Sequence, residues 1–304
     1  MVRVTAIPYL NTTPFVYGLK QKAFNHIDLS FATPAIAAHQ LQNNLCDIAI
    51  VPVATIPALP WYKIVGNYCI GAVSEVASVL LCSRVPVAHI KEVALDSESR
   101  TSVRLAQLLL RDYWHVTPRY VPLHSAALPK NSALQPPVAP PLNSIFQPVE
   151  PPSNSILPPV APPPNSILPP VAPPQNFILP PVAPPPNSES PESVVLIGDK
   201  ALLYGTTYPY VYDLATHWIR WTGKPFVFAV WLANKPLPTD FAEIFTNALA
   251  YGVSHIDNAI ASEVNEAEFP APFAKTYLTQ NISYVLDNDK YEGLKIFLDK
   301  IIAF

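Results

Sequence analysis

A proline-rich repeat divides the chain and limits what it can fold into. Residues 125–192 contain 23 of the 38 prolines and none of the 8 glycines. The unit Asn-Ser-Ile-Leu-Pro-Pro-Val-Ala-Pro-Pro-Pro recurs there with small variations and a period of 11 residues. Its asparagines are Asn143, Asn154, Asn165, Asn176 and Asn187. Because proline lacks a backbone N–H and has a fixed φ, this segment cannot build a helical or sheet core. The fold must come from the remaining 236 residues.

The repeats themselves favour polyproline II, and without glycine they form a semi-rigid spacer. Their Pro-Pro-Val-Ala-Pro-Pro units could dock on an SH3- or WW-like domain. The alternative is a repeat expansion tolerated in a surface loop, since each doubling of a loop costs only about 0.6 kcal/mol. We favour the second explanation, a repeat expansion in a surface loop, and expect the insert to be disordered or to adopt polyproline II.

Apolar runs alternate with helical stretches in the rest of the chain. A strand at 28–32, a helix from Thr33 to about Asn44 and a strand at 47–51 predict a βαβ unit with parallel strands. Such a chain is long enough for one large α/β domain or two small lobes. Later expected elements are strands at 77–82, 92–96, 193–199, 210–214 and 225–232, and one helix from 240 to about 263.

Charge and cysteine usage exclude several classes of function. The net charge is −3, and no run of Lys or Arg suggests nucleic acid or an anionic membrane surface as a partner. Cys46, Cys69 and Cys82 form no CxxC pair, which argues against a zinc cluster and a disulfide framework. No signal segment and no apolar stretch long enough for a bilayer is recognised. We therefore expect a soluble, cytoplasmic protein without a metal.

The first candidate binding residue follows the first predicted strand. Val2–Ile7 is a mostly β-branched run, and Thr13-Pro14 is a good helix start. Asn11 then lies at the carboxyl end of a strand and beside a helix N-terminus, where open α/β sheets bind ligands. Its amide can donate and accept hydrogen bonds without a charge. An equally weighted alternative is that Asn11 only turns or caps the chain.

A second candidate site lies at the start of an amphipathic helix that begins near Ser99. Its first turn presents the hydroxyls of Thr101 and Ser102 together with free backbone N–H groups, which suits a small anion. Ordinary capping by Ser99 explains the same pattern and is slightly favoured from the residues alone. Arg100 could pair with a ligand carboxylate, although a structural pair with Glu98 is favoured.

Several collinear motifs resemble the chorismate dehydratases of the futalosine route to menaquinone. The motifs are Ala6-Ile7-Pro8-Tyr9-Leu10-Asn11-Thr12, Ser78-Val79-Leu80-Leu81-Cys82, Ser99-Arg100-Thr101-Ser102, Leu196-Ile197-Gly198-Asp199-Lys200, Tyr212-Asp213-Leu214 and Thr222-Gly223-Lys224-Pro225-Phe226. The resemblance covers residues 1–124 and 193–304 and skips the repeats.

The resemblance implies a type II periplasmic-binding-protein-like α/β fold. Its two α/β lobes would be joined by two crossover strands, near Ser78–Ser83 and Pro225–Leu232. The first lobe would hold residues 1–82 and 226–304. The second would hold 83–124 and 193–225, with 125–192 inserted as a loop.

The resemblance also implies an activity, the loss of water from chorismate to give 3-[(1-carboxyvinyl)oxy]benzoate, which needs no cofactor. Asn11 and Ser78 would then act at the reacting ring, and Thr12, Ser99, Thr101 and Ser102 would bind the substrate. Glu75 departs from the family pattern and is expected to put a negative charge near a site for a dianion. A non-catalytic binding protein for a small carboxylate is the main alternative; the sister enzyme of the pathway and a proline-repeat adaptor are weaker ones.

Overall fold

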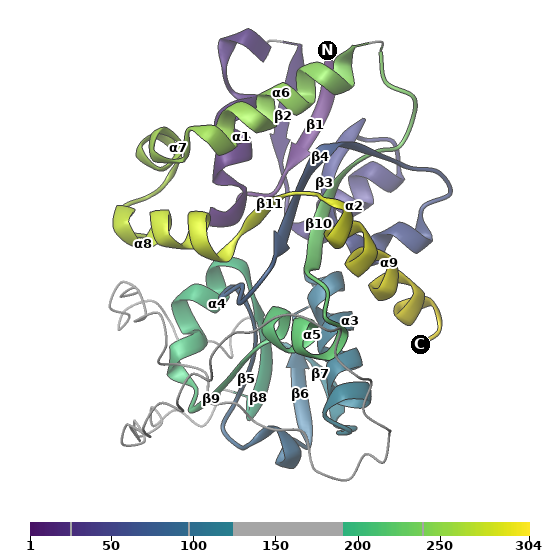
Figure 1. The fold of residues 1–304 in the computed structure, drawn as a ribbon, viewed down its shortest axis with the longest axis vertical. Coiled ribbons are helices and arrows are strands. Elements are labelled where there is room, and N and C mark those ends of the chain that lie inside the picture. Colours follow the sequence, from purple (N-terminus) through teal and green to yellow (C-terminus); the bar gives the residue numbers. More distant parts are fainter. Residues whose placement is uncertain (25, 97, 124–190, 239) are drawn as a thin grey trace, which may run out of the picture.

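The computed structural model describes residues 1–304 except 25, 97, 124–190 and 239. The proline repeats, and the expectation of a disordered or polyproline II insert, therefore lie outside the described residues. The rest of the chain forms two α/β lobes, one above the other in Figure 1. In the described part, no helix has the length and apolar character needed to cross a membrane.

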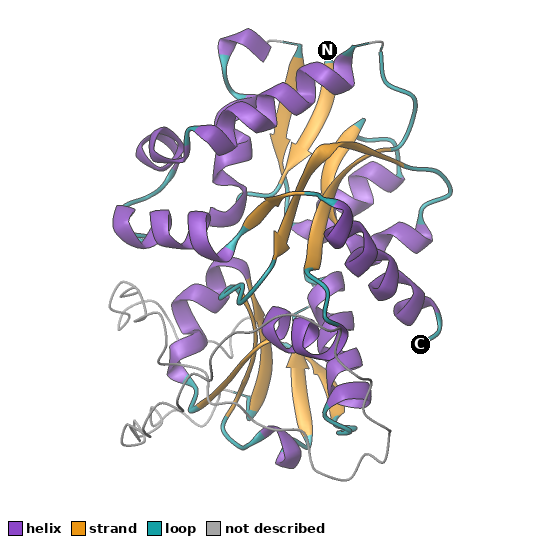
Figure 2. Ribbon diagram, viewed as in Figure 1, coloured by secondary structure: helices purple, strands orange, loops and turns teal. Residues whose placement is uncertain are grey.

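The first lobe is built on a sheet of six strands in the order β11-β4-β10-β3-β1-β2. The strands are β1 (Val2–Ala6), β2 (Ile27–Phe31), β3 (Ile48–Pro52), β4 (Lys63–Ala72), β10 (Phe226–Ala233) and β11 (Ser283–Val285). As predicted, β2 and β3 run in the same direction; each pairs in parallel with β1, which lies between them. β10 runs antiparallel to β3 and β4. Helices cover both faces of the sheet (Figure 2). They are α1 (Thr13–Leu19), α2 (Pro34–Gln42), α6 (Phe241–Ser254), α7 (Ile256–Glu263), α8 (Ala271–Thr276) and α9 (Asn288–Ile302).

The second lobe has a sheet of five strands in the order β7-β6-β8-β5-β9. The strands are β5 (Val79–Ser83), β6 (Glu92–Leu95), β7 (Arg119–Pro122), β8 (Ser193–Ile197) and β9 (Tyr210–Asp213), and the helices are α3 (Arg100–Leu108), α4 (Gly198–Tyr204) and α5 (Leu214–Thr222). β6 is parallel to both β7 and β8, so the carboxyl ends of these three strands meet at one edge of the sheet. That edge is where ligands bind in open α/β sheets.

Two segments connect the lobes. The chain leaves the first sheet after β4 and enters the second at β5, through residues 73–78; it returns through 223–225, between α5 and β10. β5 is fully buried and pairs with β8 and β9. Residues 79–82, which the sequence analysis placed in the first lobe, therefore belong to the second sheet, and the crossing lies just before the predicted strand.

Aromatic side chains fill the core where β10 meets the helices. Trp218, Trp231, Phe15, Phe226 and Phe297 are completely buried. Trp218 of the second lobe packs edge-to-face against Phe226 of the first, with ring centroids 5.2 Å apart. The return connection is therefore anchored in the core, because such pairs add stability beyond their buried area.

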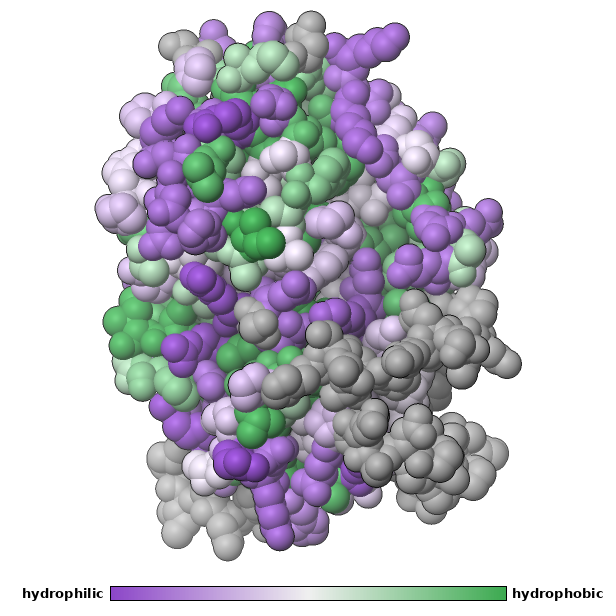
Figure 3. Space-filling view, turned by 180° about the vertical axis from the view of Figure 1, so that it is seen from behind, coloured by the Kyte–Doolittle hydropathy of each residue, from purple (hydrophilic) through white to green (hydrophobic). Residues whose placement is uncertain are grey.

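Hydrophilic and apolar side chains alternate over short distances on the face shown in Figure 3, as on an ordinary globular protein.

Two local features differ from expectation. The helix predicted at 240–263 is broken at His255, whose φ of −123° and ψ of 42° are not helical. β4 was not predicted. A glycine, Gly66, interrupts its run of strand-forming residues, and in the structure this glycine has a φ of 74°.

Candidate functional site

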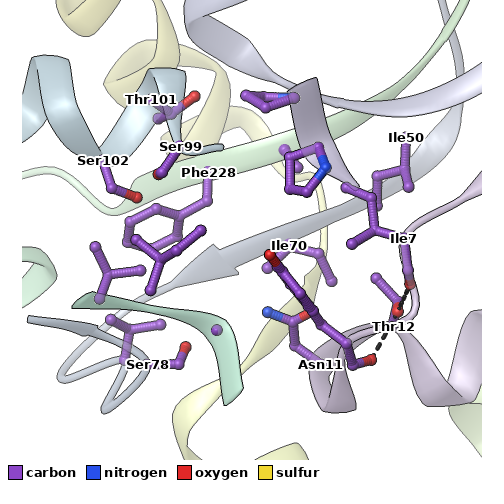
Figure 4. A pocket seen from close by; sticks show the side chains of 18 residues that line it. Ile7, Asn11, Thr12, Ile50, Ile70, Ser78, Ser99, Thr101, Ser102 and Phe228 are labelled. Atoms are coloured by element: carbon purple, nitrogen blue, oxygen red, sulfur yellow. Dashed lines mark hydrogen bonds between the residues drawn. The ribbon is translucent and has the colours of Figure 1, made fainter. Parts of the chain in front are cut away.

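A cavity of about 560 Å³, including the part open to solvent, lies between the two lobes (Figure 4). All six site residues predicted from the sequence line it: Asn11, Thr12, Ser78, Ser99, Thr101 and Ser102. Apolar side chains, among them Ile7, Ile50, Ile70, Ile197 and Phe228, make up much of the remaining wall. The cavity therefore offers a few polar groups on an apolar surface.

Asn11 reaches the cavity from a short 3-10 turn, Leu10–Thr12, which joins β1 to α1. Two side-chain hydroxyls fix this turn. The Thr12 hydroxyl hydrogen-bonds to the carbonyl oxygens of Ile7 and Tyr9. The buried Tyr284 hydroxyl donates to the Asn11 carbonyl oxygen at 3.0 Å. The strand, turn and helix expected here are confirmed, and the Asn11 side chain stands on a well-held backbone.

Ser78 lies at the end of the first crossing segment and is 1% exposed. The preceding Ala77 has a φ of 59°, a conformation that costs a non-glycine residue about 1 kcal/mol or more. Asp213 holds this strained segment, because its Oδ2 accepts the N–H groups of Val76 and Ala77 at 3.0 and 2.8 Å. Burial raises the pKa of Asp213 to about 6, although its hydrogen bonds act in the opposite direction.

The start of α3 brings three hydroxyls to the opposite wall of the cavity (Figure 4). Ser99 is the residue before the helix, and its side chain makes no capping hydrogen bond. Thr101 Oγ1 accepts the N–H of Ala54 from the first lobe at 3.1 Å. Thr101 therefore ties the lobes together, and Ser99 and Ser102 stand beside the N-terminal amides of a nine-residue helix. Arg100 is exposed and does not line the cavity.

Further contacts hold the lobes together beside the cavity. The Leu10 N–H donates to Asp199 Oδ1 at 3.0 Å, across the two lobes. Burial raises the pKa of Asp199 to about 6, and the nearby Glu268 acts in the same direction. The Tyr9 ring lies against Gly198, where a Cβ would be only 2.9 Å from the ring. Gly198 itself has a φ of 54°, so both its conformation and this close approach favour glycine.

The cavity wall carries no ionisable side chain apart from the Tyr9 phenol, as far as the described residues show. Glu75 was expected to place a negative charge near the site. It does not line the cavity, and its carboxylate accepts a hydrogen bond from Asn281 at 3.3 Å. Lys200 is held by Asp96 at 2.9 Å. Within the same residues, no group of three or more His, Cys, Asp or Glu side chains could hold a metal. An anion would therefore be bound by hydroxyls, an amide and the helix N-terminus.

Sequence reasoning did not single out four residues that shape this site. Tyr9 and Asp199 belong to motifs of the family resemblance. Their contacts across the lobes, Tyr9 with Gly198 and Asp199 with Leu10, could not be predicted from those motifs. Asp213 holds the residues just before Ser78, and the Tyr277 hydroxyl bonds to Ser78 itself. They lie 135 and 199 residues along the chain from Ser78. No local pattern connects them to it, since such contacts arise only from the tertiary fold.

Two α/β lobes joined by two crossings, with a cavity between them, define a periplasmic-binding-protein-like molecule, which confirms the expected fold class. A protein from Archaeoglobus fulgidus superposes with a TM-score of 0.63 at 14% identity, covering 99% of this chain and 97% of that one. A Candida albicans protein described as having the generic periplasmic binding protein fold gives 0.53 at 11%, covering 100% and 90%. The periplasmic aliphatic sulphonate binding protein of Escherichia coli gives 0.50 at 14%, covering 99% and 87%.

The chain belongs to the menaquinone biosynthesis family, whose sequence profile matches residues 2–136 and 176–302. This family membership supports a role in that pathway and agrees with the family resemblance of the motifs. The matched ranges leave out residues 137–175, which lie inside the proline repeats.

Proposed function

We propose that the protein is a chorismate dehydratase, a lyase that removes water from chorismate to give 3-[(1-carboxyvinyl)oxy]benzoate. The observation that carries this proposal is the cavity between the lobes. It gathers Asn11, Ser78, Ser99 and Ser102 on an apolar wall, in a chain of the menaquinone biosynthesis family. Chorismate is a small dianion with an apolar ring face, which suits such a wall.

The start of α3 would bind one substrate carboxylate. Backbone N–H groups at a helix N-terminus attract anions, and the hydroxyls of Ser99 and Ser102 can donate additional hydrogen bonds. Thr101 and Thr12 would contribute less directly, since their hydroxyls already bond to Ala54 and to the carbonyls of the first turn. Since the described part of the wall carries no cation, these donors would have to offset the cost of taking the carboxylates out of water.

Asn11 and Ser78 would act at the reacting ring. A ring C–H bond breaks, its electron pair forms a ring double bond, and the ring hydroxyl leaves with the C–O electrons. The enolpyruvyl carboxylate of the substrate takes the proton, which then leaves with the hydroxyl as water. Aromatisation drives the step. Asn11 would stabilise the charge that develops, and Ser78 would orient the leaving hydroxyl, because aligned donors act most strongly in the transition state.

The test is to incubate the purified protein with chorismate and to search by mass spectrometry for a product lighter by one water. We expect that product from the wild type. Asn11→Ala should lower turnover by about 100-fold or more, as the loss of a transition-state donor does, while melting within a few degrees of the wild type. A folded Asn11→Ala protein with full activity would contradict the assignment of Asn11.

The main alternative has its own signature in the same experiment. A wild type that forms no product but melts at a higher temperature with chorismate would be a non-catalytic carboxylate-binding protein of this fold. A cytoplasmic location is part of the proposal, and it is supported by three buried cysteines that are all free thiols. Cell fractionation would test the location directly.

A further inference from the structure

Tyr277 lies directly behind the cavity wall and does not line it. It is 2% exposed and begins a single π-helical turn, Tyr277–Asn281, that follows α8. Its hydroxyl donates a hydrogen bond of 2.7 Å to Ser78 Oγ. The Asn11 side chain lies close enough to the same phenol to favour its ionised form. One buried phenol therefore bonds to Ser78 and lies beside Asn11, the two residues that we place at the reacting ring.

The same π-helical turn holds the crossing segment at a second point. The Asn281 side-chain amide donates to both the carbonyl oxygen and the carboxylate of Glu75, each at 3.3 Å. Tyr277 and Asn281 are thus fixed to Ser78 and Glu75 at the two ends of one short segment. π-helical turns occur often at functional sites, and this one gives Ser78 a rigid support from the first lobe.

The direction of the Tyr277 hydrogen bond determines what Ser78 can do. A phenol carries one proton, and here that proton points to Ser78 Oγ. Ser78 accepts it and keeps its own proton free to donate toward the cavity. Burial raises the pKa of Tyr277, so the phenol remains a donor over the whole neutral range.

We propose that Tyr277 is a positioning residue that makes Ser78 a hydrogen-bond donor to the ligand and aligns the amide of Asn11. The inference rests on the proposed function, in which the recipient of the Ser78 proton is the leaving hydroxyl of the substrate. Tyr277 itself does not touch the substrate. Its contribution passes through Ser78 and Asn11.

The experiment compares the wild type with Tyr277→Phe, Ser78→Ala and the double variant Tyr277→Phe/Ser78→Ala. For each protein, kcat and KM for chorismate, the Kd for chorismate by calorimetry and the melting temperature are measured. Tyr208→Phe is the matched control, because it also removes a buried tyrosine hydroxyl, but one with no hydrogen-bond partner among the described residues. It should leave all these quantities unchanged.

We expect Tyr277→Phe to lower kcat about 10- to 100-fold, the size of effect that misalignment of a reacting group produces. KM should change less than threefold, and the melting temperature should stay within a few degrees. In the Ser78→Ala background the effect of Tyr277→Phe should be smaller, since the route through Ser78 is already lost.

Three results would overturn the proposal: full activity of Tyr277→Phe, an equal loss with and without Ser78, or failure of Tyr277→Phe to fold, which would make the hydroxyl structural. A wild type that binds chorismate without converting it would refute the dehydratase but not this inference. The Kd values of the wild type, the two single variants and the double variant would then decide it. A wild type that neither converts nor binds chorismate would overturn both.

Discussion

Asp199 shows how one residue links the cavity to the contact between the lobes. Its pKa is raised from 3.8 to about 6 by burial. Between these values the folded chain binds more protons than the unfolded chain does. The free energy of unfolding therefore falls as the pH rises from about 4 to about 6 through this group. Two pKa units correspond to at most about 3 kcal/mol.

Asp199→Asn should remove this dependence, because the amide oxygen can still accept the Leu10 N–H but has no proton to lose. We expect the variant to gain melting temperature relative to the wild type, by several degrees, between about pH 4 and pH 7.5. The measurement is the difference in melting temperature between Asp199→Asn and the wild type, taken once at pH 4 and once at pH 7.5. An identical difference at both would show that Asp199 titrates as an ordinary surface carboxyl.

At the residue scale, the sequence predicted the cavity lining better than the contacts behind it. Asn11 and Ser99 were placed by strand ends and helix starts, which local patterns reveal. Ser78 was found only through the family resemblance, since a serine in an apolar strand has no distinctive pattern. Tyr277 was missed because its contact with Ser78 spans most of the chain.

The packing of α1 on α6 is the element-scale feature that holds the Asn11 turn. The two helices approach so closely that a Cβ on Gly252 would lie 1.8 Å from the carbonyl oxygen of Pro14. A Cβ on Gly18 would lie 2.0 Å from the carbonyl oxygen of Ala248. Since backbone atoms cannot move aside cheaply, both positions require glycine.

Gly252→Ala should therefore lower the free energy of unfolding by about 1–3 kcal/mol or more, as overpacking does. Gly223→Ala is the control. Gly223 has a φ of 71°, but a Cβ there would meet no described atom within 4 Å, so the cost is only about 1 kcal/mol of backbone strain. Denaturant unfolding measures both. Equal losses would mean that α1 and α6 can separate without cost.

The elements themselves were largely predictable, and the exceptions have physical causes. The βαβ unit, the strand at 193–197 and the helix ended by Gly223 follow from apolar spacing and proline or glycine signals. The break between α6 and α7 has no such signal. It depends on the non-helical conformation of His255, whose Nδ1 bonds back to Tyr251 O at 2.8 Å.

At the scale of the whole molecule, the proline repeats occupy the connection from β7 to β8. These strands are both parallel to β6, so the chain must return along the length of one strand, about 17 Å. Removing residues 131–187 leaves 124–130 and 188–190, ten residues that span at most about 33 Å. That is enough to close the sheet without the repeats.

Deletion of residues 131–187 should therefore keep the melting temperature within a few degrees and kcat/KM for chorismate within about twofold. Circular dichroism and steady-state kinetics measure the two. A pull-down with the full-length chain and the deletion variant shows whether an SH3- or WW-like partner depends on the repeats. Lost activity in a folded deletion variant would show that the repeats contribute to the site.

The β7–β8 connection also has a consequence for how this chain varies. Any return path longer than about ten residues satisfies the sheet, so whole 11-residue units can be gained or lost without a change in the cavity. Natural variants of this chain should then differ in length by multiples of 11, with the two flanking segments unchanged. Natural length differences confined to this one connection would show that its length does not affect the fold.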